Sequence, residues 1–381
     1  NQMPMSENKE FNIFLSRLEK LSDEHRQEAA LKRHESGNRT ARENLKHLID
    51  EDSFIEFGAF AVAAQRSRKE YDALQIETSA DGVITGFCEI NSNEIGKENS
   101  HAVAIIYDYS VLAGTQGYFH HHKLDRIIDK AKKYSLPVVI YTEGGGGRPG
   151  DTDGLQVAGL DCLAFGLWAE LSGDVPLVGI TSGYCFAGNA AILGCCDVII
   201  ATEDANIGMG GPAMIEGGGL GTYHPSEVGP MDIQTVNGVV DILVKDEQEA
   251  VQIAKKYLSY FQGNFREWKE PNVKDLRNVI PENRLEVYDI HEVIELIADK
   301  GSILEIKAGF AKGMFTGFIR VEGRPIGLIG NNPMYLAGAI DSDCADKASR
   351  FIQICENYKI PILSLCDTPG MMVGPEVEKT G

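Results

Sequence analysis

Residues 175–202, VPLVGITSGYCFAGNAAILGCCDVIIAT, decide the fold of this chain. They open with an apolar, β-branched run at 175–181, which breaks at Ser182-Gly183-Tyr184. A short apolar helical segment, residues 190–193, and a second β-branched run, residues 198–201, follow. The pattern predicts a strand, a tight turn, a short buried helix and a second strand, an alternation typical of an α/β fold.

The turn before this helix is a candidate anion-binding site. The amide N–H groups of Gly188 and Asn189 fall at the start of the helix, where no carbonyl of the helix can accept from them. With the positive end of the helix dipole they can stabilise a negatively charged oxygen, and glycine at 188 lets a ligand approach the backbone. A structural interpretation, in which the small residues only permit close packing, also fits this segment taken alone.

The composition bounds the fold and the partners. With 381 residues and 43% hydrophobic residues, the chain is long enough for two domains with sizeable cores. A formal net charge of −20 argues against nucleic acid and membranes as partners. Residues 175–196 match a membrane span in length, but proline and glycines interrupt them, so we interpret them as buried core.

The eight cysteines form no Cys-x-x-Cys pair and lie mostly in apolar contexts, which argues against a zinc ribbon and favours a reducing compartment. Because the N-terminus is polar and lacks a signal-peptide pattern, we expect a cytoplasmic protein, or a mitochondrial matrix protein in a eukaryote.

Two segments of the chain repeat one another. The tripeptide Leu-Ala-Gly occurs at 112–114 and again at 336–338, 224 positions apart, and a Tyr-x-x-Pro motif repeats with the same spacing. Each copy reads as strand, turn, helix, strand and glycine-containing loop, which is a βαβ-like unit with a right-handed crossover. We therefore expect residues 103–149 to superpose on residues 327–373.

These features divide the chain into four parts. We expect an N-terminal helical arm at 1–50, a first α/β half at 51–265, a connecting helical segment at 266–300 and the start of a second half at 301–381. The counterpart of the turn at Gly188 would fall near position 412. The second half is therefore expected to be truncated.

A glycine-rich loop follows the strand of the first copy. Residues 143–151, EGGGGRPGD, fit neither the dinucleotide-binding pattern nor the P-loop. Four consecutive glycines give a backbone that a ligand can approach closely, and Arg148 can bind a phosphate or carboxylate. The structural alternative for Arg148 is an ion pair with Glu143 or Asp151. A second glycine-rich segment, residues 216–221, is expected to be a lid or an edge of the site.

Two further patterns support chemistry only weakly. His120-His121-His122 resembles a metal cluster, but adjacent side chains of a helix point in different directions, so we expect a solvated surface run and no metal. Ser182 lies outside the Gly-x-Ser-x-Gly context of a serine nucleophile.

Residues 175–216 resemble the core of the crotonase superfamily, in which a glycine amide at the position of Gly188 forms half of an oxyanion hole for a coenzyme A thioester. Ala191 stands where the hydratases of that superfamily carry a catalytic glutamate, which argues against a hydratase.

A closer resemblance is to the carboxyltransferase component of biotin-dependent acyl-CoA carboxylases. Its motifs here are TARENLKHLIDEDSFIEFG, ADGVITGFCEINS, FAKGMFTGFIRVEGRPIGLIGNNPMYLAGAID and ASRFIQICENYKIPILSLCDTPG. The resemblance implies an α/β fold of two tandem crotonase-like (ββα) units, the second incomplete here. It places acyl-CoA on the N-terminal half and biotin on the C-terminal half of a partner subunit.

The candidate site residues follow from this resemblance. The backbone amides of Gly188 and Asn189, with Gly146 and Gly147, are expected to form the oxyanion hole. The residues expected to bind acyl-CoA are Gly144, Gly145, Arg148, Ala187, Gly210, Gly211 and Pro212. Pro369 and Gly370 are expected on the biotin side.

The implied activity is transfer of a carboxyl group from N-carboxybiotin to the α-carbon of an acyl-CoA, with no protein base. The implied partners are the biotin carboxyl carrier and biotin carboxylase, as domains or subunits, and further copies of this chain in a homodimer or larger ring. Two alternatives stay open: a decarboxylase subunit that runs the transfer in reverse, and a non-catalytic scaffold of the same fold.

Overall fold

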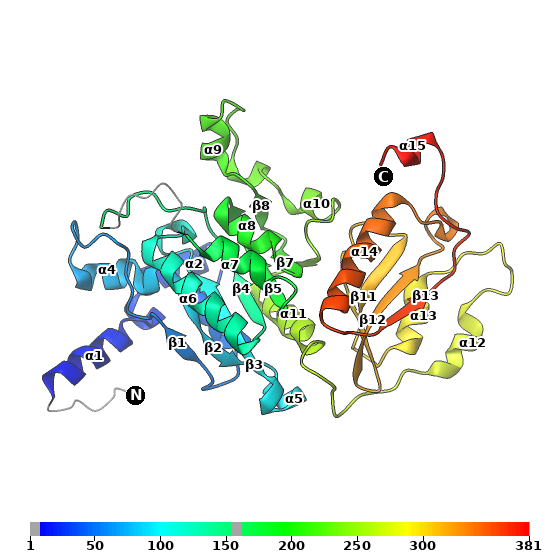
Figure 1. Cartoon of the computed structure of the whole chain (residues 1–381), viewed down its shortest axis with the longest axis horizontal. Coiled ribbons are helices and arrows are strands. Elements are labelled where there is room, and N and C mark those ends of the chain that lie inside the picture. The colour runs from blue at the N-terminus through cyan, green and yellow to red at the C-terminus, as the bar shows by residue number, and fades with distance from the viewer. Residues whose placement is uncertain (1–7, 154–161, 381) are drawn as a thin grey trace.

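The computed structural model describes residues 8–153 and 162–380, arranged in two α/β units that lie side by side (Figure 1). Within these residues the first unit holds a seven-stranded sheet of order β1-β2-β3-β4-β5-β7-β9. Its strands are β1 Ile55–Phe57, β2 Val83–Glu89, β3 His101–Tyr107, β4 Val138–Tyr141, β5 Leu177–Thr181, β7 Val198–Thr202 and β9 Ile242–Val244. The pairs β1–β2 and β2–β3 are antiparallel and the remaining pairs are parallel.

The second unit holds a four-stranded sheet of order β10-β11-β12-β13 in the described residues. Its strands are β10 Leu304–Glu305, β11 Met314–Val321, β12 Arg324–Asn331 and β13 Ile362–Leu365. A small parallel pair, β6 Tyr184–Phe186 with β8 Asn206–Gly208, stands beside the first sheet.

Helices cover both faces of the first sheet. One face packs against α6 Tyr118–Tyr134 and α7 Ala164–Leu171, and the other against α3 Ala41–Leu48 and α11 Glu247–Ser259. Every residue of β4, β5 and β7 is buried, as expected for parallel strands with helices on both sides. The remaining helices are α1 Lys9–Glu19, α2 Gln27–Glu35, α4 Tyr71–Glu77, α5 Ser92–Ile95, α8 Gly188–Gly194, α9 Pro212–Gly217, α10 Met231–Gln234, α12 Leu276–Val279, α13 Ile290–Ile297, α14 Ser342–Asn357 and α15 Pro375–Glu378.

The predicted duplication is confirmed at the level of strand register. Val103 of β3 is paired with Val138 of β4, and Gly327 of β12 is paired with Ile362 of β13, each 224 positions further on. In both units the second of these strands is reached through a helix, and the first is flanked by an antiparallel strand. The two units therefore share one strand order, as the sequence repeat predicts.

The turns of the repeat also share an uncommon backbone conformation. Ala113 and Ala337, the middle residues of the two Leu-Ala-Gly tripeptides, have φ angles of 56° and 50°. A positive φ is rare for a residue with a side chain, so its occurrence at both matched positions supports the structural equivalence of the two turns.

The two units share part of one hydrophobic core. At the end of α11, the rings of Tyr257 and Tyr260 lie with their centroids 5.6 and 5.3 Å from that of Phe318 in β11. Phe351 of α14 packs on the same Phe318 ring at 5.0 Å. Large aromatic side chains supply much buried area, so this cluster fixes the second unit against α11.

The opening stretch folds largely as predicted, with one strand that the sequence analysis missed. Its strand, helix and second strand appear as β5, α8 and β7. The break after β5 contains the extra strand β6, because its backbone pairs with β8 twenty residues later, a contact invisible to local periodicity. The sequence of residues 153–171 also predicts a helix; residues 164–171 form α7, and residues 154–161 lie outside the described part of the chain.

Most cysteines are buried, as predicted, and all eight are free thiols in the structure; Cys366 is exposed. In the parts of the chain that the structure describes, no helix is both long enough and apolar enough to cross a membrane. The bounds of the four expected parts of the chain remain predictions.

One prediction concerns the second unit and pH. His291 lies 2.9 Å from Glu305 and 2.6 Å from Asp289, and these hydrogen bonds raise its pKa to about 9 from 6.5. Because the folded pKa is the higher, the stabilisation is complete below pH 6.5 and is lost as the pH rises through 9. We expect His291→Gln to lower the free energy of unfolding by about 1 kcal/mol or less at pH 6, since the pair is partly solvent-screened. The thermal unfolding temperatures of the two proteins should converge above about pH 9.5. A difference between them that does not depend on pH would contradict the stabilising role of protonated His291.

Candidate active site

The glycine-rich loop that follows β4 runs beside the turn between β6 and α8. The Gly144 N–H donates to the Tyr184 carbonyl at 2.7 Å, and the Gly144 carbonyl accepts from the Phe186 N–H at 3.0 Å. These bonds form a parallel bridge between the loop and β6. The two glycine-containing segments that the sequence predicted separately are thus held together by backbone pairing.

The closest approach is between Gly146 and the peptide before α8. A Cβ atom on Gly146 would lie 2.7 Å from the Ala187 Cβ and 3.3 Å from the Gly188 nitrogen. Gly146 has φ +88°, and Ala187 itself has the positive φ of 52°. Only glycine fits at 146, because any side chain there would collide with Ala187 and strain the backbone.

Several amides around this approach are unused within the protein. No described residue accepts a hydrogen bond from the N–H of Gly146, Gly147, Gly188 or Asn189. The Gly145 N–H, in contrast, donates to the Ala113 carbonyl at 3.1 Å, so it is not available to a ligand. The candidate donors for an oxyanion therefore narrow to two segments, 146–147 and 188–189.

The Asn189 side chain has a structural role that the sequence analysis missed. It is fully buried, and its Nδ2 donates to the carbonyls of Gly114 and Thr142, both at 3.1 Å. A Cβ on Gly144 would lie 2.6 Å from the same Nδ2. Asn189 thus ties the first turn of α8 to the Leu-Ala-Gly turn and to the end of β4.

Two side chains beside Gly188 were also missed. A Cβ on Gly188 would lie 3.0 Å from Cζ of Phe165 and 3.4 Å from Oε1 of Gln116. The Gln116 Nε2 donates to the Tyr107 hydroxyl at 3.1 Å, and the Gln116 side chain is almost wholly buried. The sequence marks Gln116 only by its position two residues after Leu-Ala-Gly. The second copy has Ile340 at the matching position.

Arg148 forms buried ion pairs, as the structural interpretation of this residue expects. Its guanidinium pairs with Asp81 and lies 3.5 Å from Asp151, and its side chain is 1% exposed. It also donates to the Thr115 carbonyl at 2.9 Å. The expected partner Asp151 is thus present, whereas Glu143 is not a partner and Asp81 was not foreseen. Substrate binding by Arg148 remains a prediction.

Glu143 pairs instead with the N-terminal arm. Its two oxygens lie 3.0 and 2.7 Å from the terminal nitrogens of Arg33 in α2. Burial raises the pKa of Glu143 to about 7, against the lowering effect of Arg33 and with the help of nearby Glu247. The Ser182 hydroxyl is fully buried and donates to Glu247 at 3.1 Å, so Ser182 is a structural residue of this cluster.

The histidine run was wrongly predicted to be a solvated surface run. His120 is fully buried and packs edge-on against Tyr107 with ring centroids 4.5 Å apart, while His121 is partly buried and His122 exposed. The reason is that α6 covers the sheet, and its residue 120 falls on the inward face. No group of three metal-binding side chains occurs among the described residues.

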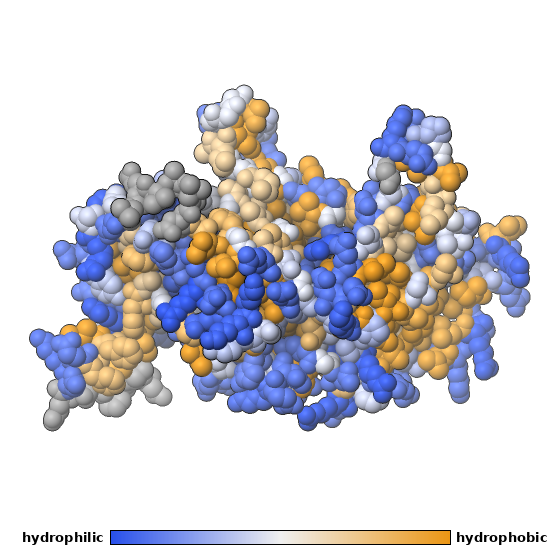
Figure 2. Space-filling model, viewed as in Figure 1, coloured by the Kyte–Doolittle hydropathy of each residue, from blue (hydrophilic) through white to orange (hydrophobic). Residues whose placement is uncertain are grey.

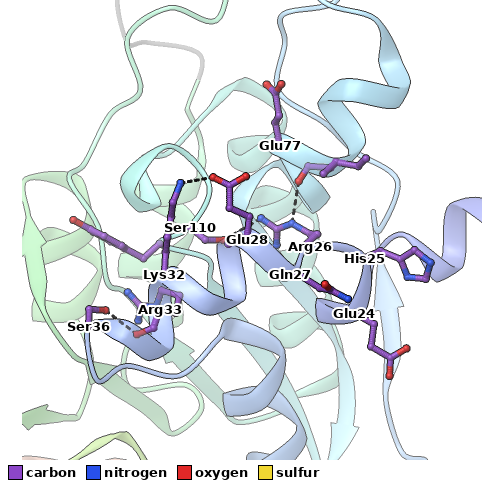
Figure 3. Close-up of a pocket in the computed structure, with 13 residues that line it drawn as sticks. Glu24, His25, Arg26, Gln27, Glu28, Lys32, Arg33, Ser36, Glu77 and Ser110 are labelled. Carbon is purple, nitrogen blue, oxygen red and sulfur yellow. Dashed lines mark hydrogen bonds and ion pairs between the residues drawn. The ribbon is translucent and has the colours of Figure 1, made fainter.

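Two cavities open near this region. One, of about 770 Å³, is lined by Gln65, Arg68, Lys69, Leu112, Ala113, Thr115, Arg148, Pro149 and Gly150. It contains part of the polar loop before α4 and borders the glycine-rich loop. The other, of about 830 Å³, lies at the N-terminal arm, where Figure 3 shows Arg26 and Arg33 with Lys32 paired to Glu28.

The segment after β8 projects from the first unit (Figure 1). A Cβ on Gly211 would lie 3.3 Å from the Phe186 ring, which places the predicted residues Gly210, Gly211 and Pro212 beside β6. Further out, Met209, Met214 and Leu220 are 73%, 64% and 73% exposed, and Figure 2 shows apolar surface on this projection. The predicted lid, residues 216–221, forms the tip of the segment.

The predicted biotin-side residues lie between β13 and α15 on the second unit, whereas α8 lies on the first (Figure 1). The Gly370 carbonyl accepts from the Ile340 N–H at 3.0 Å, the counterpart of the bond from Gln116 to Gly146. Gly370 has φ +132° and nothing lies within 4 Å of the place a Cβ would take, so a ligand has room against its backbone. Pro369 is exposed beside it.

Comparison with known proteins identifies a family for this chain. Residues 32–381 match the carboxyl transferase domain family. The chain is 31% identical over 96% of its length to the biotin-dependent long chain acyl-coenzyme A carboxylase beta4 subunit of Mycobacterium tuberculosis, of which it covers 69%. It spans about two thirds of the length of the curated relatives it matches.

Two solved structures share the fold. A single-chain, multi-domain long-chain acyl-CoA carboxylase matches 98% of this chain with a TM-score of 0.94 and 51% identity, over 38% of its own length. The transcarboxylase 12S hexamer with methylmalonyl-coenzyme A matches 99% of this chain with a TM-score of 0.82 and 28% identity, over 74% of its own length. The two α/β units are therefore crotonase-like, and the chain belongs to the carboxyl transferase domain family of biotin-dependent acyl-CoA carboxylases.

Proposed function

We propose that this chain transfers a carboxyl group from N-carboxybiotin to the α-carbon of an acyl-CoA. The observation that carries the proposal is the close approach of two segments, 146–147 and 188–189, whose backbone N–H groups have no acceptor among the described residues. Carboxylation at the α-carbon passes through an enolate, whose charge develops on the thioester oxygen. Preorganised N–H donors stabilise that charge more in the transition state than in the bound thioester.

The residues around the donors would position the acyl-CoA. Phe165 and Gln116 lie beside Gly188, where they would border the space for the thioester carbonyl. The cavity beside the glycine-rich loop offers Arg68 and Lys69 to the negatively charged part of coenzyme A. Carboxybiotin, when bound, would supply the carboxyl group and would also act as the base, in place of a protein side chain. The open backbone at Gly370 leaves room for a ligand, so Pro369 and Gly370 are the candidate residues to hold biotin.

The acyl group and the assembly are part of the same proposal. We favour a long-chain acyl-CoA, because the solved structure with 51% identity is that of a long-chain acyl-CoA carboxylase. We also propose a homodimer within a larger ring, since the related 12S protein is described as a hexamer. Biotin would be carried by a carrier domain or subunit that a biotin carboxylase charges, in the cytoplasm.

The direct test is an assay of the full-length protein with its carrier and carboxylase components. Radiolabelled bicarbonate, ATP and a series of acyl-CoA substrates from acetyl to palmitoyl are supplied, and acid-stable label on the acyl-CoA is measured. We expect labelled product, with the highest kcat/KM for long chains. The absence of label with every substrate would refute the transfer activity, and net decarboxylation of malonyl-type esters under the same conditions would favour the decarboxylase alternative.

A further inference from the structure

The glycine-rich loop is anchored at each end by a buried ion pair. At its start, Glu143 accepts from both terminal nitrogens of Arg33 in the N-terminal arm, at 3.0 and 2.7 Å. At its end, Arg148 pairs with Asp81. The side chains of Arg33 and Glu143 are 9% and 7% exposed, and those of Arg148 and Asp81 are 1% and 0% exposed. All four charges are therefore largely shielded from water.

The second copy of the loop lacks both anchors. The positions that match Glu143 and Arg148 hold Asp367 and Met372. Asp367 bonds only to the Tyr288 hydroxyl, at 2.7 Å, among the described residues, and Met372 carries no charge. Nevertheless the bridge from Ile340 to Met371 repeats the bridge from Gln116 to Gly147. The backbone of the second loop thus adopts the same pairing without such ion pairs. We infer that the ion pairs of the first unit are not needed merely to form its loop.

Each ion pair is itself fixed by a further contact. Glu247 at the start of α11 lies 3.8 Å from Arg33 and accepts a hydrogen bond from Asn44 of α3 at 2.8 Å. Asp81 accepts from the His120 backbone N–H at 2.8 Å. The bidentate Arg33–Glu143 pair fixes the start of the loop relative to the arm. The Asp81–Arg148 pair connects the end of the loop to the His120 backbone of α6.

Resting on the carboxyltransferase function proposed above, we propose that Arg33 and Asp81 are positioning residues. By holding Glu143 and Arg148, they keep the Gly146 and Gly147 amides in register with Gly188. The tolerance is small, because even a Cβ atom at position 146 would lie only 2.7 Å from the Ala187 Cβ and 3.3 Å from the Gly188 nitrogen. A misplacement of about 1 Å in a catalytic group typically lowers the rate about 100-fold. The N-terminal arm, which contacts no donor amide, is thereby part of the catalytic apparatus.

The chain offers a matched control. Arg42 of α3 pairs with Glu56 in the same two-bond geometry, at 2.7 and 3.0 Å, but neither residue contacts the loop. Arg33→Met and Arg42→Met each remove one such guanidinium and leave a carboxylate unpaired. Arg33→Lys keeps the charge but cannot make the paired bonds.

The experiment measures kcat and KM for acyl-CoA in the assembled holoenzyme, with acyl-CoA binding by calorimetry and folding by circular dichroism. We expect Arg33→Met to lower kcat by about 10- to 100-fold with KM and binding changed less than about threefold, by the positioning argument. Arg33→Lys should lie between it and the wild type, and Arg42→Met should stay within about threefold of the wild type in kcat.

An unchanged kcat in folded Arg33→Met, or an equal loss in Arg42→Met, would overturn the positioning role. If Arg33→Met does not fold, the comparison of Arg33→Lys with Arg42→Lys decides in the same way. An inactive wild-type holoenzyme would instead refute the proposed function itself, so the two failures are distinguishable.

Discussion

Gly188→Pro is expected to lower carboxyl transfer by at least about 100-fold, the usual effect of removing one oxyanion donor. Proline has no N–H, yet its φ suits the first position of a helix, which is where Gly188 stands in α8. Acyl-CoA binding should weaken far less, because the lost bond strengthens mainly as charge develops. The measurement is kcat and KM in the full assembly, with circular dichroism to verify folding.

Gly188→Ala is the control for bulk. Its methyl group would lie 3.0 Å from Phe165, but its N–H is kept. We therefore expect a smaller loss of kcat than in the proline variant. If the two variants lose activity equally, crowding of Phe165 explains the effect. If folded Gly188→Pro keeps full turnover, Gly188 serves only for packing.

The second large effect is expected at Gly146. Alanine there must adopt a φ near +88° and place its Cβ 2.7 Å from that of Ala187, so either the loop or the turn before α8 must move. Such strain amounts to about 1–3 kcal/mol, and displacement of the donors should lower kcat by more than about tenfold.

Gly147→Ala is the matched control for that substitution. Nothing lies within 4 Å of its Cβ position and its φ is not positive, while its N–H is retained. It should unfold at nearly the wild-type temperature, whereas Gly146→Ala should unfold at a lower one. Equal thermal unfolding of the two alanine variants would contradict the close approach between the loop and the turn.

The repeat and the turn at Gly188 could be predicted because each is marked by a short sequence motif. A spacing of 224 positions between Leu-Ala-Gly tripeptides is visible in the sequence, and the structure repeats it in register and in φ. Likewise, Gly188 is readable as a helix start, because an apolar run breaks and resumes around it. Short motifs of this kind can be recognised in the sequence without knowledge of tertiary contacts.

The rest of the site depends on contacts distant in sequence. Arg33 and Glu143 are 110 positions apart, and Arg148 and Asp81 are 67 apart, so no periodicity links them. The wrong interpretation of His120 has the same origin, since a polar triplet gives no sign of which member faces the sheet. Which polar residues form ion pairs or become buried depends on tertiary contacts, and the local sequence pattern does not show these contacts.

The most direct measurement is a structure of the full-length assembly with a non-reactive acyl-CoA analogue in which the thioester carbonyl is retained. The account predicts the carbonyl oxygen within about 2.7–3.1 Å of the Gly188 nitrogen and of an amide nitrogen from Gly146 or Gly147. It also predicts Arg33 and Arg148 in their ion pairs with ligand bound. A carbonyl oxygen bonded to neither segment, with coenzyme A seated elsewhere in the chain, would contradict it.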